Sequence, residues 1–184
     1  GVLFAGIGTA TAMADDLADG FIDRLRSLPI PRSSVLLSRV LADTAILAFT
    51  SAVTVGIAYA VGFRLHGSAA EGLAAFALVI AFGFAFEWVF IPLGLFAGNA
   101  QAAPVIGMIG FPFAFISSAY VPVGSMPGQL QVFADHQPLT PMVDAVRALA
   151  LGRPASHAVT EALLWTLAIL VVALPLAVAK YRRG

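Results

Sequence analysis

Long apolar runs alternate with short polar segments along the 184 residues of the chain. A first, short run occupies 1–14, and longer runs occupy about 41–63, 73–97, 102–123 and 158–179. About 20 apolar residues cross a bilayer as a helix, whereas the first run is too short at about 1.5 Å per residue. The pattern therefore predicts an all-α, polytopic transmembrane helix bundle: the end of one span, followed by four complete spans in a single transmembrane domain.

Composition supports a membrane protein and excludes several functions. The chain is 60% hydrophobic and only 11% charged, whereas soluble domains have about 25% charged residues. There is no cysteine, which excludes disulfides, thiol nucleophiles and thiolate metal sites. The zero net charge argues against nucleic acid as the main partner. Because the chain begins at Gly1 within an apolar run, we expect it to be a fragment of a longer protein.

The basic residues predict which way the chain crosses the membrane. Four spans separate the charged segment 15–40 from the C-terminus, so both are expected on one face. That face carries seven of the ten Lys and Arg residues: Arg24, Arg26, Arg32, Arg39, Lys180, Arg182 and Arg183. The other face carries Arg64, Arg147 and Arg153. The positive-inside rule then places the 15–40 loop and the C-terminus in the cytoplasm, with the protein in the cell (plasma) membrane.

The charged segment itself predicts a short amphipathic helix followed by a turn. Apolar side chains recur at helical spacing, at Leu17, Phe21, Leu25 and Leu28. Pro29 and Pro31 are expected to end this helix, because proline lacks a backbone donor and restricts the residue before it. A second helix then enters the membrane.

The outer segment at 124–157 is expected to carry short helices rather than a plain loop. Its first part, SMPGQLQVFADHQP, can form one helical turn or two. A second helix is predicted over 141–151, because Thr140 followed by Pro141 places proline at the first helical position, where its missing N–H is harmless. Gly152 is the candidate C-cap.

The second of these outer helices has a predicted apolar stripe at Val143, Val146 and Leu149, so it is expected to lie on or dip into the outer surface. Asp144 and Arg147 are three positions apart and can pair along it. The residues assigned to this outer surface helix are Pro138, Thr140, Pro141, Asp144 and Arg147.

Glu87 lies near the centre of the 73–97 run, at a depth where an ionisable group is costly and normally faces the bundle interior. Two interpretations remain open. Glu87 lines a substrate path or contacts a cationic substrate, or it is a protonated or hydrogen-bonded structural residue. Aromatic residues of the same run and the next suit an apolar path, although packing against lipid is their default role. The residues predicted for this path are Glu87, Phe86, Phe90, Phe111 and Phe115.

Glycine and proline positions in two of the runs predict close packing and a weakened helix. Gly94 and Gly98 have the spacing that lets two transmembrane helices approach closely. Pro104 and Pro112 weaken the 102–123 helix, and a break there serves gating or is tolerated through neighbouring partners.

No enzymatic motif is complete. Asp16, Asp19, Gly20 and Arg24 resemble the opening of the CDP-alcohol phosphotransferase signature, but Asp23 replaces its alanine. The later glycine and two aspartates of that signature are replaced by Ser33, Leu37 and Leu41. Half of the oxygen cage that a divalent metal needs is therefore missing. The sequence predicts no catalytic residue.

A nucleotide or metal site is not expected either. A P-loop needs lysine after glycine, and the only lysine, Lys180, follows Ala179. His66, His136 and His157 fall in separate predicted outer segments, which favours solvated loop residues over a metal site. We expect this chain to bind no cofactor of its own.

The order of two segments resembles the ABC-2 type permease family, near its daunorubicin-resistance type of drug-export permeases. DDLADGFIDRLRSLPIPRSSVLLSRVLAD resembles the family's cytoplasmic loop, in which an acidic-Gly segment precedes "RL…LP…R". FPFAFISSAYVPVGSMPGQLQVFADHQPLTPMVDAVRAL resembles its outer signature. His136-Gln137-Pro138-Leu139-Thr140 stands where the family often has Asn-Pro-(apolar)-Thr.

The resemblance implies a permease of six spans, of which the first and part of the second precede this chain. It implies two permease halves, homo- or heterodimeric, and a separate ATPase subunit that binds ATP-Mg. It also implies a coupling helix that docks on that ATPase. The residues assigned to coupling are Leu17, Phe21, Arg24, Leu25, Arg26, Leu28, Pro29, Pro31 and Arg32.

The function implied is export of a hydrophobic or amphipathic small molecule, such as a drug, an antibiotic or a lipid-like compound, driven by the partner ATPase. A secondary transporter or channel is one alternative, although Glu87 is essentially the only ionisable residue within the predicted spans. A non-transporting membrane scaffold is the other alternative.

Overall fold

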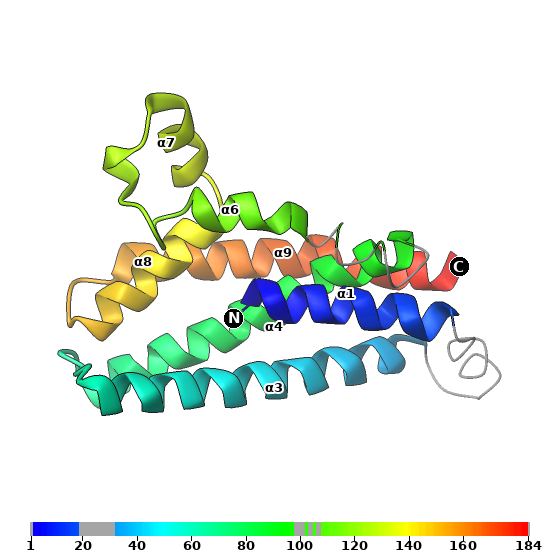
Figure 1. The fold of residues 1–184 in the computed structure, drawn as a ribbon, viewed down its shortest axis with the longest axis horizontal. Helices are drawn as coiled ribbons and strands as arrows, with labels where there is room; N and C mark the ends of the chain where they lie inside the picture. Colours follow the sequence, from blue (N-terminus) through cyan, green and yellow to red (C-terminus); the bar gives the residue numbers. More distant parts are fainter. Residues whose placement is uncertain (1, 19–31, 98–101, 103–104, 106–107, 184) are drawn as a thin grey trace. The chain divides into compact units, whose positions relative to one another are not determined.

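Helices account for most of the computed structural model, which describes residues 2–18, 32–97, 102, 105 and 108–183. The long helices are α1 (Val2–Ala18), α3 (Arg32–Val61), α4 (Ala69–Ala97) and α9 (Ser156–Arg183) (Figure 1). The short ones are η1 (Met108–Gly110), α6 (Phe111–Phe115), η2 (Val123–Ser125), α7 (Gly128–Asp135) and α8 (Leu139–Ala150). The described residues contain no β-strand.

Three of the long helices are long and apolar enough to cross a membrane, over 36–61, 69–96 and 156–181. Their outward faces are apolar: the side chains of Phe49 and Val61 on α3 are 69% and 83% exposed. Such surfaces are unfavourable in water and suit contact with lipid. The prediction of an all-α, polytopic membrane protein is confirmed.

Helices α1 and α3 extend beyond the predicted apolar runs into the polar segment between them. α1 continues to Ala18, and α3 begins at Arg32 rather than near residue 41. The first turns of α3 are helical because Leu36 and Val40 are fully buried and anchor them. The second helix predicted after Pro31 is therefore confirmed as the start of α3, and part of the 15–40 segment is helical.

The predicted run at 102–123 is wrong in its second half. α6 ends at Phe115, and residues 116–122 form turns. The backbone carbonyls of Ile116 and Ser118 accept hydrogen bonds from the side chains of Gln137 and Arg147, at 2.8 Å each. These bonds replace those of a continuing helix. Residues 98–101, 103–104 and 106–107 lie outside the described part of the chain.

The chain divides into two compact units, and each is described separately. Unit 1 comprises 1–49, 83–109 and 168–184, and unit 2 comprises 50–82 and 110–167. The main core of unit 1 joins α1, α3, α4 and α9. Its buried residues are Met13, Leu36, Val40, Trp88, Ile91, Ala173, Ala177 and Tyr181.

Helices α1 and α4 approach closely within unit 1 because small residues face each other. A Cβ atom added at Gly94 would overlap the backbone carbonyl of Ala10, and one added at Gly6 would overlap the ring of Phe90. The predicted close approach at Gly94 is therefore confirmed, while Gly98 lies outside the described residues. Such contacts are typical of helix pairs in membranes.

In unit 2, α7 fulfils the prediction of a helical turn or two, and α8 the prediction of a second helix. Because α8 begins at Leu139, Pro141 is its third residue rather than its first. The N–H that proline lacks has no intrahelical partner at either position. Of the predicted apolar stripe only Leu149 is buried, since the packed face runs through Met142 and Ala145.

The predicted C-cap of α8 is confirmed. Gly152 has a φ of 63°. Its N–H bonds to the carbonyl of Leu149 at 3.3 Å, and the N–H of Arg153 bonds to that of Ala148 at 2.9 Å. This is the Schellman arrangement, in which the left-handed residue is usually glycine. The same helix end holds the 62–68 segment, because the N–H of His66 bonds to the carbonyl of Ala150 at 3.0 Å.

Candidate functional site

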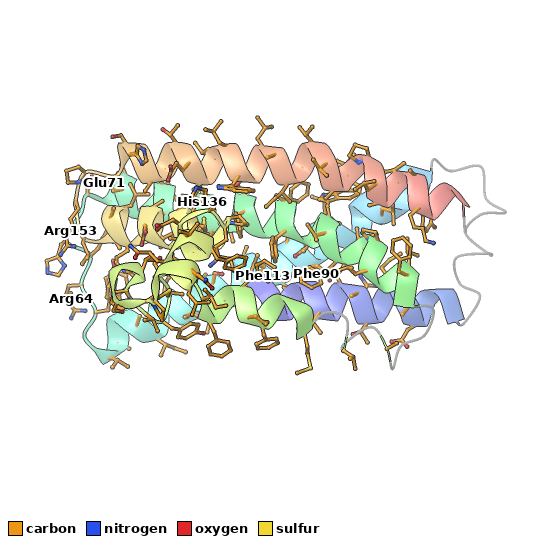
Figure 2. All side chains as sticks on the ribbon, turned by 90° about the horizontal axis from the view of Figure 1, so that it is seen from above. Arg64, Glu71, Phe90, Phe113, His136 and Arg153 are labelled. Atoms are coloured by element: carbon orange, nitrogen blue, oxygen red, sulfur yellow. The ribbon has the colours of Figure 1, made fainter. Side chains whose placement is uncertain are left out.

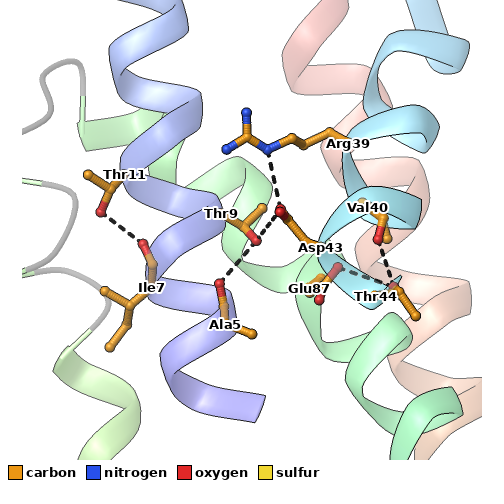
Figure 3. Close-up of polar contacts among 9 residues, drawn as sticks. All are labelled: Ala5, Ile7, Thr9, Thr11, Arg39, Val40, Asp43, Thr44 and Glu87. Carbon is orange, nitrogen blue, oxygen red and sulfur yellow. Dashed lines mark hydrogen bonds and ion pairs between the residues drawn. The ribbon is translucent and has the colours of Figure 1, made fainter. Parts of the chain in front are cut away.

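A cluster of polar side chains lies among the apolar helices of unit 1 (Figure 3). It comprises Thr9 of α1, Arg39, Asp43 and Thr44 of α3, and Glu87 of α4. Thr9 Oγ1 lies 2.8 Å from Asp43 Oδ2, and Arg39 Nε lies 3.3 Å from the same oxygen. Thr44 Oγ1 lies 3.5 Å from Glu87 Oε2. The cluster thus connects three helices through side chains far apart in the sequence.

Local sequence explains how the cluster forms. Arg39 and Asp43 are four residues apart on α3, the spacing at which side chains on one helix face meet. Thr9 reaches Asp43 because α1 lies near its neighbours, and the small residues Gly6, Ala10 and Gly94 permit that approach on the α4 side. The spacing on α3 therefore pairs Arg39 with Asp43, and the packing of α1 adds Thr9 to this pair.

Glu87 is the most deeply buried ionisable group of this cluster. It is 1% exposed, whereas the side chains of Arg39 and Asp43 are 30% and 18% exposed. Within the described residues, its Oε1 atom is buried without a hydrogen-bond partner. The prediction that Glu87 faces the interior is therefore confirmed. Whether it contacts a substrate remains a hypothesis.

The aromatic residues predicted for the path fall into two groups. On α4, Phe86 and Phe90 form an edge-to-face pair with centroids 5.6 Å apart. Phe90 is buried against Ala10 and Ala14, so it is part of the core of unit 1. On α6 in unit 2, Phe111 and Phe115 stack with centroids 6.4 Å apart. A role of either group in transport stays a prediction.

A second polar junction lies in unit 2, around the start of α8. Arg147 Nη1 lies 3.1 Å from Asp144 Oδ1, which confirms the predicted pair. Arg147 Nη2 also donates to the carbonyl of Ser118 at 2.8 Å, and Ser118 Oγ lies 3.4 Å from the carbonyl of Thr140. These contacts hold the 116–122 turns against α8, together with the bond from Gln137 to Ile116.

Sequence reasoning identified Asp144, Arg147 and Thr140 in this junction but missed Gln137 and Ser118. Pro138 and Pro141 lie at the start of α8, as N-cap and within the first turn. Sequence spacing does not reveal the contacts of Ser118 and Gln137. Each contact joins the 116–122 turns to a residue that is distant in sequence. Figure 2 shows Arg64 and Arg153 at the same end of unit 2.

The predicted coupling residues lie largely outside the described part of the chain. The coupling residues outside the described part are Phe21, Arg24, Leu25, Arg26, Leu28, Pro29 and Pro31. Leu17 belongs to α1 and Arg32 begins α3, so the described helices flank the segment on both sides.

Metal-binding geometry is not found among the described residues, where no group of three or more His, Asp or Glu side chains is placed to hold an ion. His136 Nδ1 lies 2.8 Å from the carbonyl of Val132, and His157 Nδ1 lies 3.7 Å from Glu161 Oε2. Each of these two histidines thus has a partner on its own helix or the turn that ends it.

Comparison with known proteins gives a consistent result. Residues 2–151 match the ABC-2 type transporter family. A probable doxorubicin resistance ABC transporter permease protein, DrrC, from two strains of Mycobacterium tuberculosis, is 32% identical over 187 residues, covering 99% of this chain and 67% of the relative. The daunorubicin resistance ABC transporter permease protein DrrB1 of Streptomyces coeruleorubidus is 29% identical over 182 residues, covering 98% of this chain.

The chain spans 64% of the length of DrrB1, so about a third of that relative has no counterpart in it. No solved structure matches the chain.

Proposed function

Because the chain belongs to the ABC-2 type transporter family, we propose that it is the membrane permease subunit of an ATP-driven ABC exporter. Its cargo is a hydrophobic or amphipathic small molecule, such as a drug, an antibiotic or a lipid-like compound. The observation that carries this proposal is the family match over 2–151, which includes α3 and α4 entirely. The relatives' names, which specify doxorubicin and daunorubicin resistance, support the cargo class.

The energy for transport comes from a separate ABC ATPase subunit. ATP-Mg binds to that partner, and this chain binds no cofactor. The absence of a P-loop lysine supports this division, because Lys180 is the only lysine and follows Ala179. Two permease copies, identical or paralogous, complete the exporter.

The 15–40 segment and the C-terminus face the cytoplasm, where they meet the ATPase. The distribution of Lys and Arg supports this orientation. Closure of the ATPase would press on the segment around 17–28, and α3, which begins at Arg32, would carry the movement into the membrane. The described helices on both sides of the segment, α1 and α3, each contribute to the polar cluster of unit 1. A movement passed to α1 or α3 would therefore act on the contact between Thr9 and Asp43.

Two groups of side chains are assigned to the cargo path: Phe86, Glu87 and Phe90 of α4 in unit 1, and Phe111 and Phe115 of α6 in unit 2. On the outer side, α8 with Asp144 and Arg147 forms a rigid surface helix, held to the 116–122 turns by the bond from Arg147 to Ser118.

Charge reversal in the cytoplasmic segment tests the coupling role. The double change Arg24→Glu/Arg26→Glu is expected to weaken association with the ATPase and to abolish transport, because the docking surface loses two positive charges and gains two negative ones. Copurification of the two subunits and cargo efflux from cells measure both effects.

The matched control is Arg24→Lys/Arg26→Lys, which keeps both charges and is expected to retain most of the association. If the glutamate variant kept full association and transport, this segment would not be the coupling element.

A further inference from the structure

The charges of the unit 1 cluster do not balance. Arg39 pairs with Asp43 at 3.3 Å, which compensates that carboxylate. Glu87 faces the same cluster (Figure 3), and no second described cation is paired with it. On α9, Lys180 lies over the ring of Phe96 at 4.1 Å and is engaged there. An uncompensated carboxylate at this depth is strongly unfavourable, so one positive charge or one proton is needed beside Glu87.

The hydrogen bonds around Glu87 indicate which protonation state of its carboxyl group suits the packed structure. Each threonine hydroxyl has one hydrogen. The hydroxyl of Thr44 lies 2.7 Å from the carbonyl oxygen of Val40 and 3.5 Å from Glu87 Oε2, so the shorter bond, to Val40, is the stronger of the two. That of Thr9 bonds to Asp43 at 2.8 Å. Among the described residues, Glu87 therefore has only the long, shared contact from Thr44 to Oε2 and no partner at Oε1, an arrangement that suits a protonated carboxyl group rather than a carboxylate.

The surroundings of Glu87 suit an organic cation better than a metal ion. Phe84 and Phe90 lie three positions before and after Glu87 on α4, and Phe84 is paired edge-to-face with Trp88 at 6.4 Å. Aromatic faces attract ammonium groups. A hard metal ion needs six or more oxygen ligands, and the described residues form no such group.

We propose that Glu87 of α4, which faces Asp43 and Thr44 of α3 (Figure 3), binds one protonated amine of the cargo. The amine replaces the proton that Glu87 holds while α3 and α4 are packed together. The exchange is balanced: the carboxyl group releases one proton to water, and the carboxylate forms an ion pair with the incoming ammonium. Since the site is closed in this structure, entry of the cargo requires α3 and α4 to separate at Thr44.

This inference rests on the proposed function, because it assigns a charge class to the cargo of the permease. It makes the cargo an amphipathic monocation. Neutral lipid-like compounds of the same size would bind less tightly, since they would leave Glu87 protonated and its Oε1 without a partner.

The test compares two probes that differ in one group, naphthylmethylamine and naphthylmethanol. Each is titrated calorimetrically into the full-length protein in phosphatidylcholine nanodiscs, with empty nanodiscs as the blank for partition into lipid. A charged hydrogen bond is worth about 1.5–3 kcal/mol, so the amine is expected to bind about tenfold or more tightly than the alcohol. Titration in two buffers of different ionisation enthalpy is expected to show release of about one proton per amine bound.

Variants assign the effect to Glu87. Glu87→Gln has nearly the same shape as the protonated residue and is expected to remove both the preference for the amine and the proton release. Glu87→Asp keeps the carboxyl group and is expected to retain part of each. The matched control is Glu161→Gln on α9, at an exposed position, which is expected to change neither.

Equal binding of the two probes to the unaltered protein, or an amine preference that persists in Glu87→Gln, would overturn the inference. The proton release is measured on the unaltered protein, so it decides the question even if a variant fails to fold. Because no ATP or ATPase is present, failure here leaves the proposed function intact. Amine binding without ATP-driven transport would overturn the proposed function alone.

Discussion

The distance between α1 and α4 in unit 1 depends on single glycines, Gly94 above all. A Cβ at this position would overlap the backbone of Ala10, which cannot move away as a flexible side chain would. Gly94→Ala is therefore expected to destabilise the protein by about 1–3 kcal/mol, the usual cost of overpacking. Denaturant unfolding in detergent measures the change.

Gly56→Ala on α3 is the matched control, because a Cβ at Gly56 meets no atom within 4 Å. It is expected to be neutral or slightly stabilising, since alanine favours helix more than glycine does. If both variants had the same stability, α1 and α4 would not approach as closely as described.

Arg147 makes a second residue-level prediction. Its two terminal nitrogens contact different partners, Asp144 Oδ1 and the carbonyl of Ser118. Lysine has a single terminal nitrogen and cannot reproduce this fork. Arg147→Lys is expected to cost about 1 kcal/mol and to raise amide hydrogen exchange in 116–122.

Arg153→Lys is the control for this change, and it is expected to leave exchange in 116–122 as it was. Unaltered exchange in Arg147→Lys would mean that the turns are held by Gln137 and the backbone alone.

For single residues, the sequence predicted contacts between neighbours on one helix and missed contacts between different helices. Glu87 stands out as a carboxyl group within an apolar run, and the spacing of Asp144 and Arg147 predicts their pair. Thr9 and Asp43, which complete the cluster with Glu87, are separated by 34 residues. Their contact depends on the packing of α1 and α3, for which single residues give no signal.

Among the short elements, α8 depends most clearly on one residue, Gly152. Its positive φ of 63° costs other L-residues about 1–2 kcal/mol, less for asparagine and more for β-branched side chains. A Cβ there would also lie 3.0 Å from the carbonyl oxygen of His66. Gly152→Val is therefore expected to lower the unfolding midpoint and loosen the 62–68 segment.

Gly152→Asn separates the two effects, because asparagine tolerates the left-handed conformation but still carries a Cβ atom. A small loss of stability in the asparagine variant and a large one in the valine variant is the expected order. The reverse order would contradict the Schellman cap.

The end of α6 and the start of α4 were not predicted correctly from the apolar runs. The apolar run at 102–123 has no charged residue to mark the end of α6 at Phe115. That helix ends where the side chains of Gln137 and Arg147, which are distant in sequence, bond to the carbonyls of Ile116 and Ser118. The predicted run at 73–97 also missed the start of α4 at Ala69. Ser68 and Glu71 form a capping box, with the Ser68 N–H donating to Glu71 Oε2 at 2.6 Å and the Glu71 N–H to Ser68 Oγ at 3.2 Å.

For the whole molecule, the apolar runs and the family match agree on a multi-pass transporter subunit, while the orientation rests on the distribution of basic residues. The chain has no cysteine, so single cysteines can be introduced without background. Ser125→Cys, at an exposed position of η2, is expected to react with a membrane-impermeant maleimide in intact cells. Ser27→Cys is expected to react only after permeabilisation. The opposite labelling pattern would show that the protein has the opposite orientation in the membrane.

ATP dependence of transport tests the central claim most directly. The complete permease and its ATPase partner are reconstituted into sealed vesicles, and uptake of a fluorescent amphipathic amine is followed. Uptake is expected only with ATP-Mg on the ATPase side and not when the P-loop lysine of the partner is replaced. Uptake that persists without ATP and follows an imposed proton gradient would contradict the account and identify the chain as a secondary transporter.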